Sequence, residues 1–173
     1  MNFMANFKAD RARYPKHAFL REQSLWAVWV YRFGRATQDL DPPILRWVAD
    51  KTYWILFRIV ETLTGCSFPK SVVIGPGLRI HHFGNIFIHR DVRIGAFCTL
   101  RQGVTIGTRI DGGPTPVLED GVDIGAGAQV LGDVRVGNGA KIGALSLVLE
   151  DVPSGATAVG IPARIISRQE PAQ

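Results

Sequence analysis

The sequence predicts a mainly β protein: a left-handed parallel β-helix of six-residue repeats, preceded by an N-terminal α-helical extension. Two observations lead to this fold class. An aliphatic residue returns at every sixth position over much of the C-terminal part of the chain, and the segment before it has a different, tryptophan-rich composition. A six-residue period fits neither an α-helix nor an alternating strand. Short strands joined by corners, three of which complete one coil of a solenoid, do produce it.

The repeat has two positions that we expect to be buried. The aliphatic residue is expected to point into the coil and to stack on its equivalents in the coils above and below. A small or branched residue four positions later is expected to fill the narrow corner, and glycine often follows the aliphatic because it takes backbone angles that a Cβ disfavours. The aliphatic positions are Ile74, Ile80, Ile88, Ile94, Leu100, Ile106, Leu118, Ile124, Val130, Val136, Ile142 and Val148, and the corner positions are Val92, Cys98, Val104, Val122, Ala128, Val134, Ala140, Ser146 and Val152.

The repeat is interrupted twice. The step 80–88 spans eight residues and contains the adjacent histidines His81 and His82. A longer excursion, 107–117, separates two further repeats and is rich in glycine and proline. Insertions in a solenoid leave the regular surface as loops, often on the binding face. The two interruptions are therefore the first places in which to look for function.

The N-terminal extension reads as two amphipathic helices, 19–35 and 44–63, divided by Asp41-Pro42-Pro43. We expect them to pack on each other, on the first coil and on neighbouring subunits. Contact with a membrane surface is the less favoured alternative. The predicted organisation is a helical region at 1–70, a β-helix domain at 71–166 and a tail at 167–173. The helices contain all the tryptophans, Trp26, Trp29, Trp47 and Trp54.

Composition and charge narrow the class of protein. The chain has 173 residues, 46% of them apolar, and a net charge of +5. The basic residues are scattered and no nucleic-acid-binding module is visible, so the charge favours an anionic small molecule rather than nucleic acid. Cys66 and Cys98 make no disulfide framework, and we find no signal peptide or membrane-spanning stretch. A cytoplasmic protein is expected.

The closing repeats resemble a known family. Residues 124–128 (IGAGA), 141–144 (KIGA) and 159–164 (VGIPAR) are similar to the last coils of bacterial hexapeptide-repeat acyltransferases. The nearest branch comprises the serine acetyltransferases and their relatives in exopolysaccharide biosynthesis of the colanic-acid type. The resemblance covers about 73–166. It implies an acetyl-CoA-dependent O-acetyltransferase that forms a homotrimer, with one active site at each subunit interface and no metal.

The resemblance also implies which residues bind acetyl-CoA. The donor would lie in the groove between adjacent β-helices and contact mainly the backbone, where small side chains allow close approach. An arginine suits the phosphates of CoA. The positions of this sequence that match are Gly107, Ala126, Ala144, Ile161, Pro162 and Arg164.

The eight-residue step of serine acetyltransferases carries an Asp-His pair whose histidine is the general base. Here His82 takes the histidine position, and His81 replaces the aspartate as an orienting residue. The family's Arg-His-Pro in the excursion is matched by 114–116, so Thr115 replaces the second histidine. Asp10, Phe83 and Thr115 are the expected contacts of the acceptor. The base would remove the hydroxyl proton during direct attack on the thioester.

The acceptor separates the remaining alternatives. Free serine is a zwitterion and needs a cation and an anion in its site, because a buried unpaired charge is costly. Since the family's charged partners are replaced, we expect a sugar hydroxyl of surface polysaccharide biosynthesis. Serine O-acetylation in cysteine biosynthesis is the alternative. A zinc-dependent carbonic anhydrase on the same fold would need histidines on neighbouring coils, and none follows His89. A non-catalytic scaffold would not explain the two interruptions.

Overall fold

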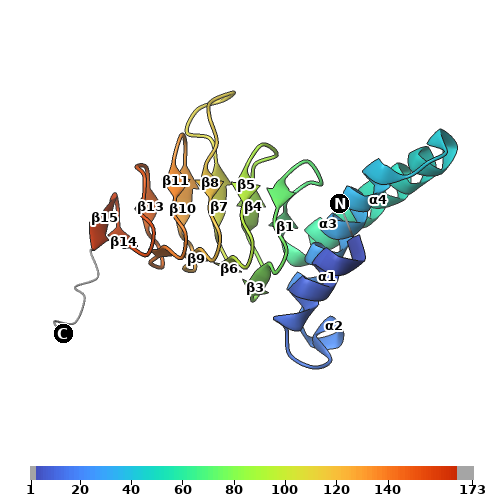
Figure 1. Ribbon diagram of the computed structural model, residues 1–173, viewed down its shortest axis with the longest axis horizontal. Coiled ribbons are helices and arrows are strands. Elements are labelled where there is room, and N and C mark those ends of the chain that lie inside the picture. The colour runs from blue at the N-terminus through green and yellow to red at the C-terminus, as the bar shows by residue number, and fades with distance from the viewer. Residues whose placement is uncertain (1–2, 167–173) are drawn as a thin grey trace.

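The computed structural model describes residues 3–166. A helical region at the N-terminus leads into a solenoid whose short strands form three sheets (Figure 1). The helices are α1 (Phe3–Ala12), α2 (Ala18–Arg21), α3 (Ser24–Ala36), a 3-10 turn (Thr37–Asp39) and α4 (Pro43–Thr64). The strands are β1 (Cys66–Ser67), β2 (Val73–Ile74), β3 (Arg79–His81), β4 (Ile86–Ile88), β5 (Arg93–Ile94), β6 (Thr99–Arg101), β7 (Thr105–Gly107), β8 (Val117–Leu118), β9 (Asp123–Ile124), β10 (Gln129–Leu131), β11 (Arg135–Val136), β12 (Lys141–Ile142), β13 (Leu147–Val148), β14 (Thr157–Gly160) and β15 (Ala163–Ile166).

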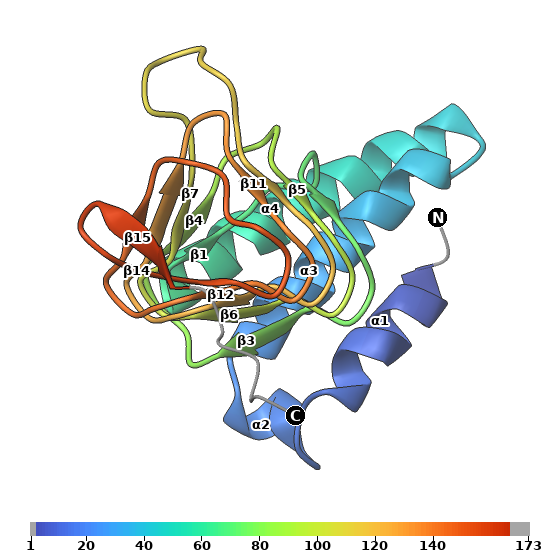
Figure 2. The ribbon, with the colours of Figure 1, turned by 60° about the vertical axis from the view of Figure 1, so that its left-hand side comes forward.

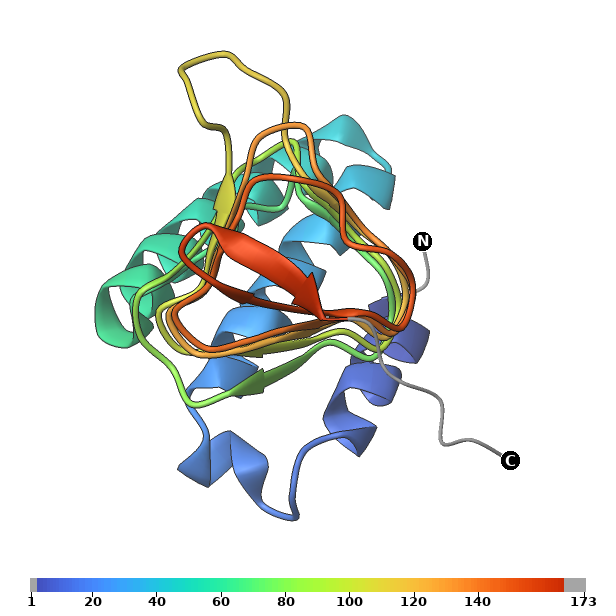
Figure 3. The same cartoon turned by 90° about the vertical axis from the view of Figure 1, so that its left-hand side faces the viewer.

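Strands that are three apart in the chain pair in parallel, as a triangular coil requires. Sheet A has the order β1-β4-β7-β10-β13, sheet B has β11-β8-β5-β2, and sheet C has β15-β14-β12-β9-β6-β3. Only the last pairing, β14 with β15, is antiparallel among those of residues 3–166. The predicted left-handed parallel β-helix with an N-terminal helical extension is confirmed. In a view along its axis the coils superimpose, and the 107–117 excursion extends outside their outline (Figure 3).

The interior of the solenoid is built from the repeat positions. Every predicted aliphatic position from Ile74 to Val148 and every predicted corner position from Val92 to Val152 is buried. Together they form one continuous apolar core that reaches the helical region through Tyr31 and Phe68. The glycines at the corners are required sterically. A Cβ on Gly125 would lie 2.5 Å from the backbone nitrogen of Ala144 in the next coil.

The helical region differs from the expectation in two ways. Helix α1 was not expected, and the predicted 19–35 helix is divided at Glu22 and Gln23 into α2 and α3. The solenoid also begins earlier than residue 71, because β1 already pairs with β4 in sheet A. The predicted tail at 167–173 lies outside the described residues. Among the residues that are described, no helix is long and apolar enough to cross a bilayer.

Helices α3 and α4 lie side by side at the N-terminal end of the solenoid (Figures 1 and 2). Tyr53 of α4 packs against Val30 of α3 in a small apolar cluster. The opposite face of α4 is uncovered in one chain, where Trp47 is 61% exposed and Trp54 44% exposed. Trp47 and Trp54 therefore do not fill an intramolecular core, whereas Trp29 packs against the small cluster. Packing on neighbouring subunits stays a prediction.

A buried ion pair joins the helices to the first coil. Arg32 of α3 donates to both carboxylate oxygens of Asp10 of α1, over 2.8 and 3.0 Å. The same guanidinium donates to the carbonyls of Ile74 and Gly75, and the backbone N–H of Leu78 donates to Asp10 over 2.8 Å. Both side chains are at most 1% exposed. The relative positions of α1, α3 and the first coil therefore depend on this one ion pair.

We predict that Asp10→Ala lowers the free energy of unfolding by about 3 to 5 kcal/mol, because it leaves the Arg32 charge buried without its partner. Arg58→Ala, which removes the exposed ion pair with Glu61, is the control and should cost less than about 1 kcal/mol. Urea unfolding followed by circular dichroism at one protein concentration measures both. Equal effects of the two substitutions would contradict the structural role given to Asp10.

Candidate active site

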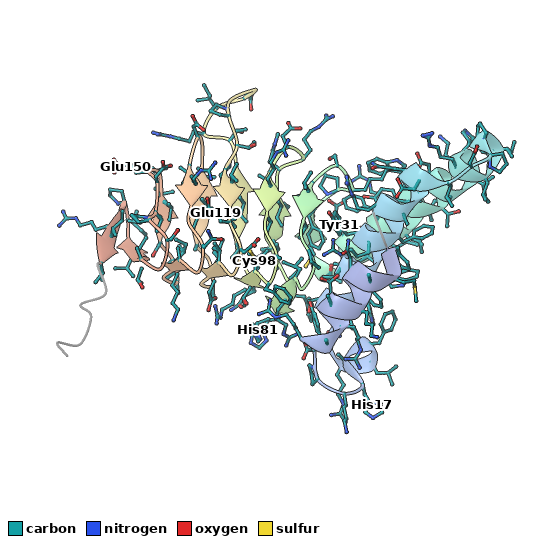
Figure 4. All side chains as sticks on the ribbon, in the orientation of Figure 1. His17, Tyr31, His81, Cys98, Glu119 and Glu150 are labelled. Carbon is teal, nitrogen blue, oxygen red and sulfur yellow. The ribbon has the colours of Figure 1, made fainter. Side chains whose placement is uncertain are left out.

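The two adjacent histidines lie where sheet C turns into sheet A. His81 is the last residue of β3, and its neighbour Ile80 points into the core, so strand alternation directs His81 outward. His82 has a left-handed backbone with φ 62°, which starts the extended corner leading to β4. Figure 4 shows His81 outside the coil, on the side of β3 where α2 lies. Both histidines therefore lie on the outside of the solenoid, at the point where the six-residue repeat is interrupted.

A cavity of about 310 Å³ lies between this corner and the α2–α3 junction. It is lined by Arg21, Glu22, Gln23, Ser24, Arg79, His81, His82 and Phe83. The predicted residues His81, His82 and Phe83 are thus brought together in one hollow. Its opposite wall is helical, and it is positioned because Ser24 donates a hydrogen bond of 3.1 Å to the carbonyl of Ile80 in β3.

The electrostatics of the cavity are dominated by an arginine. Arg79, at the start of β3, forms a bidentate ion pair with Glu22, and its Nη2 lies 3.2 Å from Oε1 of that carboxylate. The other side of the guanidinium faces His81, with 3.4 Å between Nη2 and Nδ1. Because a guanidinium only donates, Nδ1 of His81 must carry the lone pair in this contact. His81 then has its proton on Nε2.

The pKa of the His81 imidazole is lowered from its ordinary value of 6.5. Burial is the largest cause, followed by the positive charges of Arg79 and of Arg101, which lies beside His81 in the register of β3 and β6. Glu22 acts in the opposite direction, and His82 lowers the pKa slightly. At neutral pH His81 is therefore a neutral imidazole, in agreement with the contact that its Nδ1 makes.

The predicted acetyl-CoA residues divide between two edges of the solenoid. Ala126 and Ala144 occupy the same corner as His82 in later coils, as a ladder of backbone hydrogen bonds shows: Gly103 to Gly84, Gly127 to Gln102 and Leu145 to Ala126, each of 2.8 or 2.9 Å. Ile161 and Pro162 form the exposed turn between β14 and β15 that closes this edge, and Arg164 is exposed on β15. Gly107 ends β7, at the opposite end of sheet A.

Two predicted acceptor contacts lie elsewhere in the chain. Asp10 does not line the cavity, because both of its carboxylate oxygens are held by Arg32 in the interior. Thr115 lies in the excursion before sheet B, where its hydroxyl donates 3.1 Å to the carbonyl of Asp91. Within one chain, therefore, neither residue reaches the space beside His82.

Comparison with known proteins now decides the family. The serine acetyltransferase of Bacillus licheniformis is 35% identical over 160 residues, which cover 90% of this chain and 69% of the relative. The chain belongs to the serine acetyltransferase family. The enzyme of Synechococcus elongatus is 40% identical over 116 residues, which cover 66% of this chain but only 48% of the relative. The chain thus spans between about half and two thirds of the length of these serine acetyltransferases. No family model matches it.

Solved structures of this family have the same fold. Soybean serine acetyltransferase in complex with serine superimposes with a TM-score of 0.78 at 30% identity, over 95% of this chain and 68% of that one. A serine acetyltransferase in complex with CoA gives a TM-score of 0.77, also at 30% identity, over the same shares of both chains. Membership of the family supports the predicted enzyme class, an acyltransferase, and the complex of a family member with CoA supports the predicted acetyl donor.

The predicted class of acceptor, a sugar, was wrong. We expected a sugar hydroxyl of surface polysaccharide biosynthesis, whereas the similar proteins named above are serine acetyltransferases. The error came from weighing charges mainly at the positions of the family motif, where Pro114 and His81 stand. A glycan acceptor is not supported, and the similar proteins favour the alternative, serine.

Sequence reasoning also missed the charged residues of the cavity. Arg79 occupies an outward-facing strand position two residues before His81, and the repeat pattern already placed it on the same surface. Glu22 gave no such signal, because it lies within the segment that we expected to be one continuous helix. The described residues contain no group of three or more metal-binding side chains.

We predict that the pKa of His81 lies below 6.5 and rises toward that value in Arg101→Gln, which removes one of the two nearby cations. On lowering the pH, the His81 ring should therefore become protonated only at more acidic pH than an exposed histidine. NMR of ring-labelled histidine, assigned with His81→Gln, measures this. Arg135→Gln, remote from the cavity, is the control, and a His81 titration at or above pH 6.5 would contradict the prediction.

Proposed function

We propose that this protein is a serine O-acetyltransferase that transfers the acetyl group of acetyl-CoA to the hydroxyl of serine, the step that commits serine to cysteine biosynthesis. The observation that carries the proposal is the similarity to serine acetyltransferases along 90% of the chain. Acetyl-CoA is a cytoplasmic metabolite, and we expect the protein in the cytoplasm.

His82 is the general base of the proposed reaction. Its imidazole removes the proton of the serine hydroxyl as the oxygen attacks the acetyl carbonyl, and the tetrahedral intermediate then expels CoA as the thiolate. The proton held by His82 passes to that thiolate, so that O-acetylserine and CoA leave with the imidazole neutral again. The oxyanion needs hydrogen-bond donors, which backbone N–H groups at the solenoid corner can supply. His81 faces the same cavity and orients the acceptor through its Nε2–H.

Acetyl-CoA is proposed to lie along the edge that continues from His82. Ala126 and Ala144 offer backbone without bulky side chains on successive coils of that edge, and the exposed Arg164 suits the phosphates of CoA. Gly107 and Thr115 lie away from it in the same chain. They approach it only if a second subunit supplies them. This division between two edges supports the homotrimer with active sites at its interfaces.

Turnover of serine tests the role of His82. We predict that His82→Asn lowers kcat with serine by a factor of about 10² to 10⁴, the usual contribution of a positioned base. Asparagine is chosen because it tolerates the left-handed backbone of this position. Release of CoA is followed with a thiol reagent, and the KM for acetyl-CoA should change little.

His17→Asn is the matched control. His17 has the same left-handed backbone, with φ 61°, is exposed, and does not line the cavity. Its turnover should equal that of the parent protein. Normal turnover of His82→Asn would remove His82 from the mechanism, whereas an unmodified protein that acetylates no serine would refute the proposed function itself.

The assembly can be measured separately. We predict a particle of three chains of 19.0 kDa in multi-angle light scattering, since a trimer brings the excursion of one subunit to the histidine edge of the next. The uncovered apolar face of α4 (Ile44, Trp47, Ile55 and Leu63) fits burial in such an assembly. A monomer that retained full activity would contradict interface sites.

A further inference from the structure

We propose that Arg79 and Glu22 recognise the carboxylate and the ammonium group of the acceptor, and so select a zwitterionic amino acid; this inference rests on the proposed function. Both residues line the cavity that contains His81 and His82. Their side chains are 9% and 23% exposed, so they are largely withdrawn from water while still facing that space. They form a bidentate ion pair, with the Oε1 contact at 3.2 Å.

The charges of this pair suit a molecule that carries one charge of each sign. Arg79 and Glu22 neutralise each other, so neither charge is left unpaired in a poorly solvated place. A bound zwitterion can put its carboxylate beside the guanidinium and its ammonium beside the carboxylate, which gives four charges of alternating sign. An acceptor with one charge would gain only one of these two contacts, and a neutral acceptor would gain neither.

Both groups have bonding capacity left for a ligand. A guanidinium carries five N–H donors in a fixed plane, and a carboxylate accepts about four hydrogen bonds. The bidentate contact uses one donor on each terminal nitrogen of Arg79. A second N–H of Nη2 faces Nδ1 of His81. The remaining donors, on Nε and Nη1, are available to the carboxylate of an amino acid, and the unused lone pairs of Glu22 are available to its ammonium group.

The surroundings hold Arg79 in place before a ligand arrives. Its guanidinium carbon lies 4.0 Å from the ring centroid of Tyr14, a cation–π contact that fixes the plane of the group. The hydroxyl of Tyr14 in turn accepts 3.1 Å from the backbone N–H of Ile80 in β3. Glu22 is fixed at the end of α2, where its N–H donates 2.7 Å to the carbonyl of Ala18. A preorganised pair loses little side-chain freedom on binding.

The proposal also explains how serine is bound although the family's motif is altered. Pro114 and Thr115 replace the arginine and the histidine of the family motif, and His81 replaces its aspartate. At neutral pH these three positions therefore offer the acceptor no charge of either sign. Arg79 and Glu22 supply a cation and an anion within the same cavity. Recognition of the zwitterion thus comes from the strand before the histidines and from the α2–α3 junction.

Three acceptors that carry the same primary hydroxyl but differ in charge test this assignment in the full-length protein. Serine is compared with serine methyl ester, which lacks the anionic carboxylate, and with 3-hydroxypropionate, which lacks the ammonium group. We expect kcat/KM for serine to exceed that for either analogue by about 10- to 100-fold, the effect of losing a hydrogen bond to a charged group. A protein that used the methyl ester as well as serine would overturn the proposal without any variant.

Substitutions then assign each end of the acceptor. Arg79→Gln should lower kcat/KM for serine by about 10- to 100-fold and leave the methyl ester nearly unchanged. Glu22→Gln should lower kcat/KM for serine by a similar factor and leave kcat/KM for 3-hydroxypropionate nearly unchanged. The KM for acetyl-CoA should not move in either variant. If Arg79→Gln fails to fold, Glu22→Gln and the analogue ratios of the parent protein decide the matter.

Arg135→Gln is the matched control, because it breaks an ion pair with Glu119 of 2.5 Å that lies outside the cavity. Its kcat/KM should equal that of the parent protein for serine, serine methyl ester and 3-hydroxypropionate. Equal losses of serine and of both analogues in the Arg79 and Glu22 variants would show that the pair only anchors α2, and would overturn the inference while serine acetylation by the parent protein stands. Absence of serine acetylation in the parent protein would instead refute the proposed function.

Discussion

The ion pair between Asp10 and Arg32 determines where the helical wall of the cavity lies. Asp10 links α1 to the N–H of Leu78, and Arg32 links α3 to the carbonyls of Ile74 and Gly75, so both helices are fixed to the first coil by charged hydrogen bonds in the interior. Helix α2 lies between α1 and α3 in the chain, so the places of these two helices restrict where α2 can lie. A buried pair of this kind adds little net stability but strongly disfavours any arrangement that separates its partners. Its main effect is to specify the geometry of the α2–α3 junction, and hence the place of Glu22.

The solenoid supplies the other half of the site by repetition. Each coil places its corner on the corner before it, with one backbone hydrogen bond from Gly103 to Gly84 and another from Gly127 to Gln102. The histidines and the alanines of later coils therefore share one straight edge although they are far apart in sequence. A long, narrow co-substrate needs such an edge. The core beneath is continuous and apolar, so the edge has little freedom to bend, and the reacting groups keep a constant spacing.

The sequence revealed the parts of the structure that repeat. A single six-residue period predicted the buried positions from Ile74 to Val148, the three-sided coil and the two interruptions, because each repeat bears the same steric requirement. It revealed little of what is made by pairs of residues distant in the chain. Helix α1, the break at Glu22 and the burial of Asp10 depend on contacts across 22 to 68 positions, and such contacts leave no periodic trace. The same limit concealed the charged pair of the cavity, since Arg79 and Glu22 are 57 positions apart.

In the proposed reaction the chain carries two separate parts of one site. The corner between sheets C and A has the proposed base, the charged pair and the small residues proposed for the donor, whereas the end of β7 and the excursion have Gly107 and Thr115 at the other end of sheet A. A rigid solenoid cannot fold back on itself to unite them. In the proposed homotrimer, rotation about an axis parallel to the solenoid would bring the second edge of one chain to the first edge of the next, and three-fold symmetry would close this head-to-tail contact. Assembly would then be a condition of the proposed catalysis, because the regularity that makes the fold stable also prevents a single chain from completing such a site.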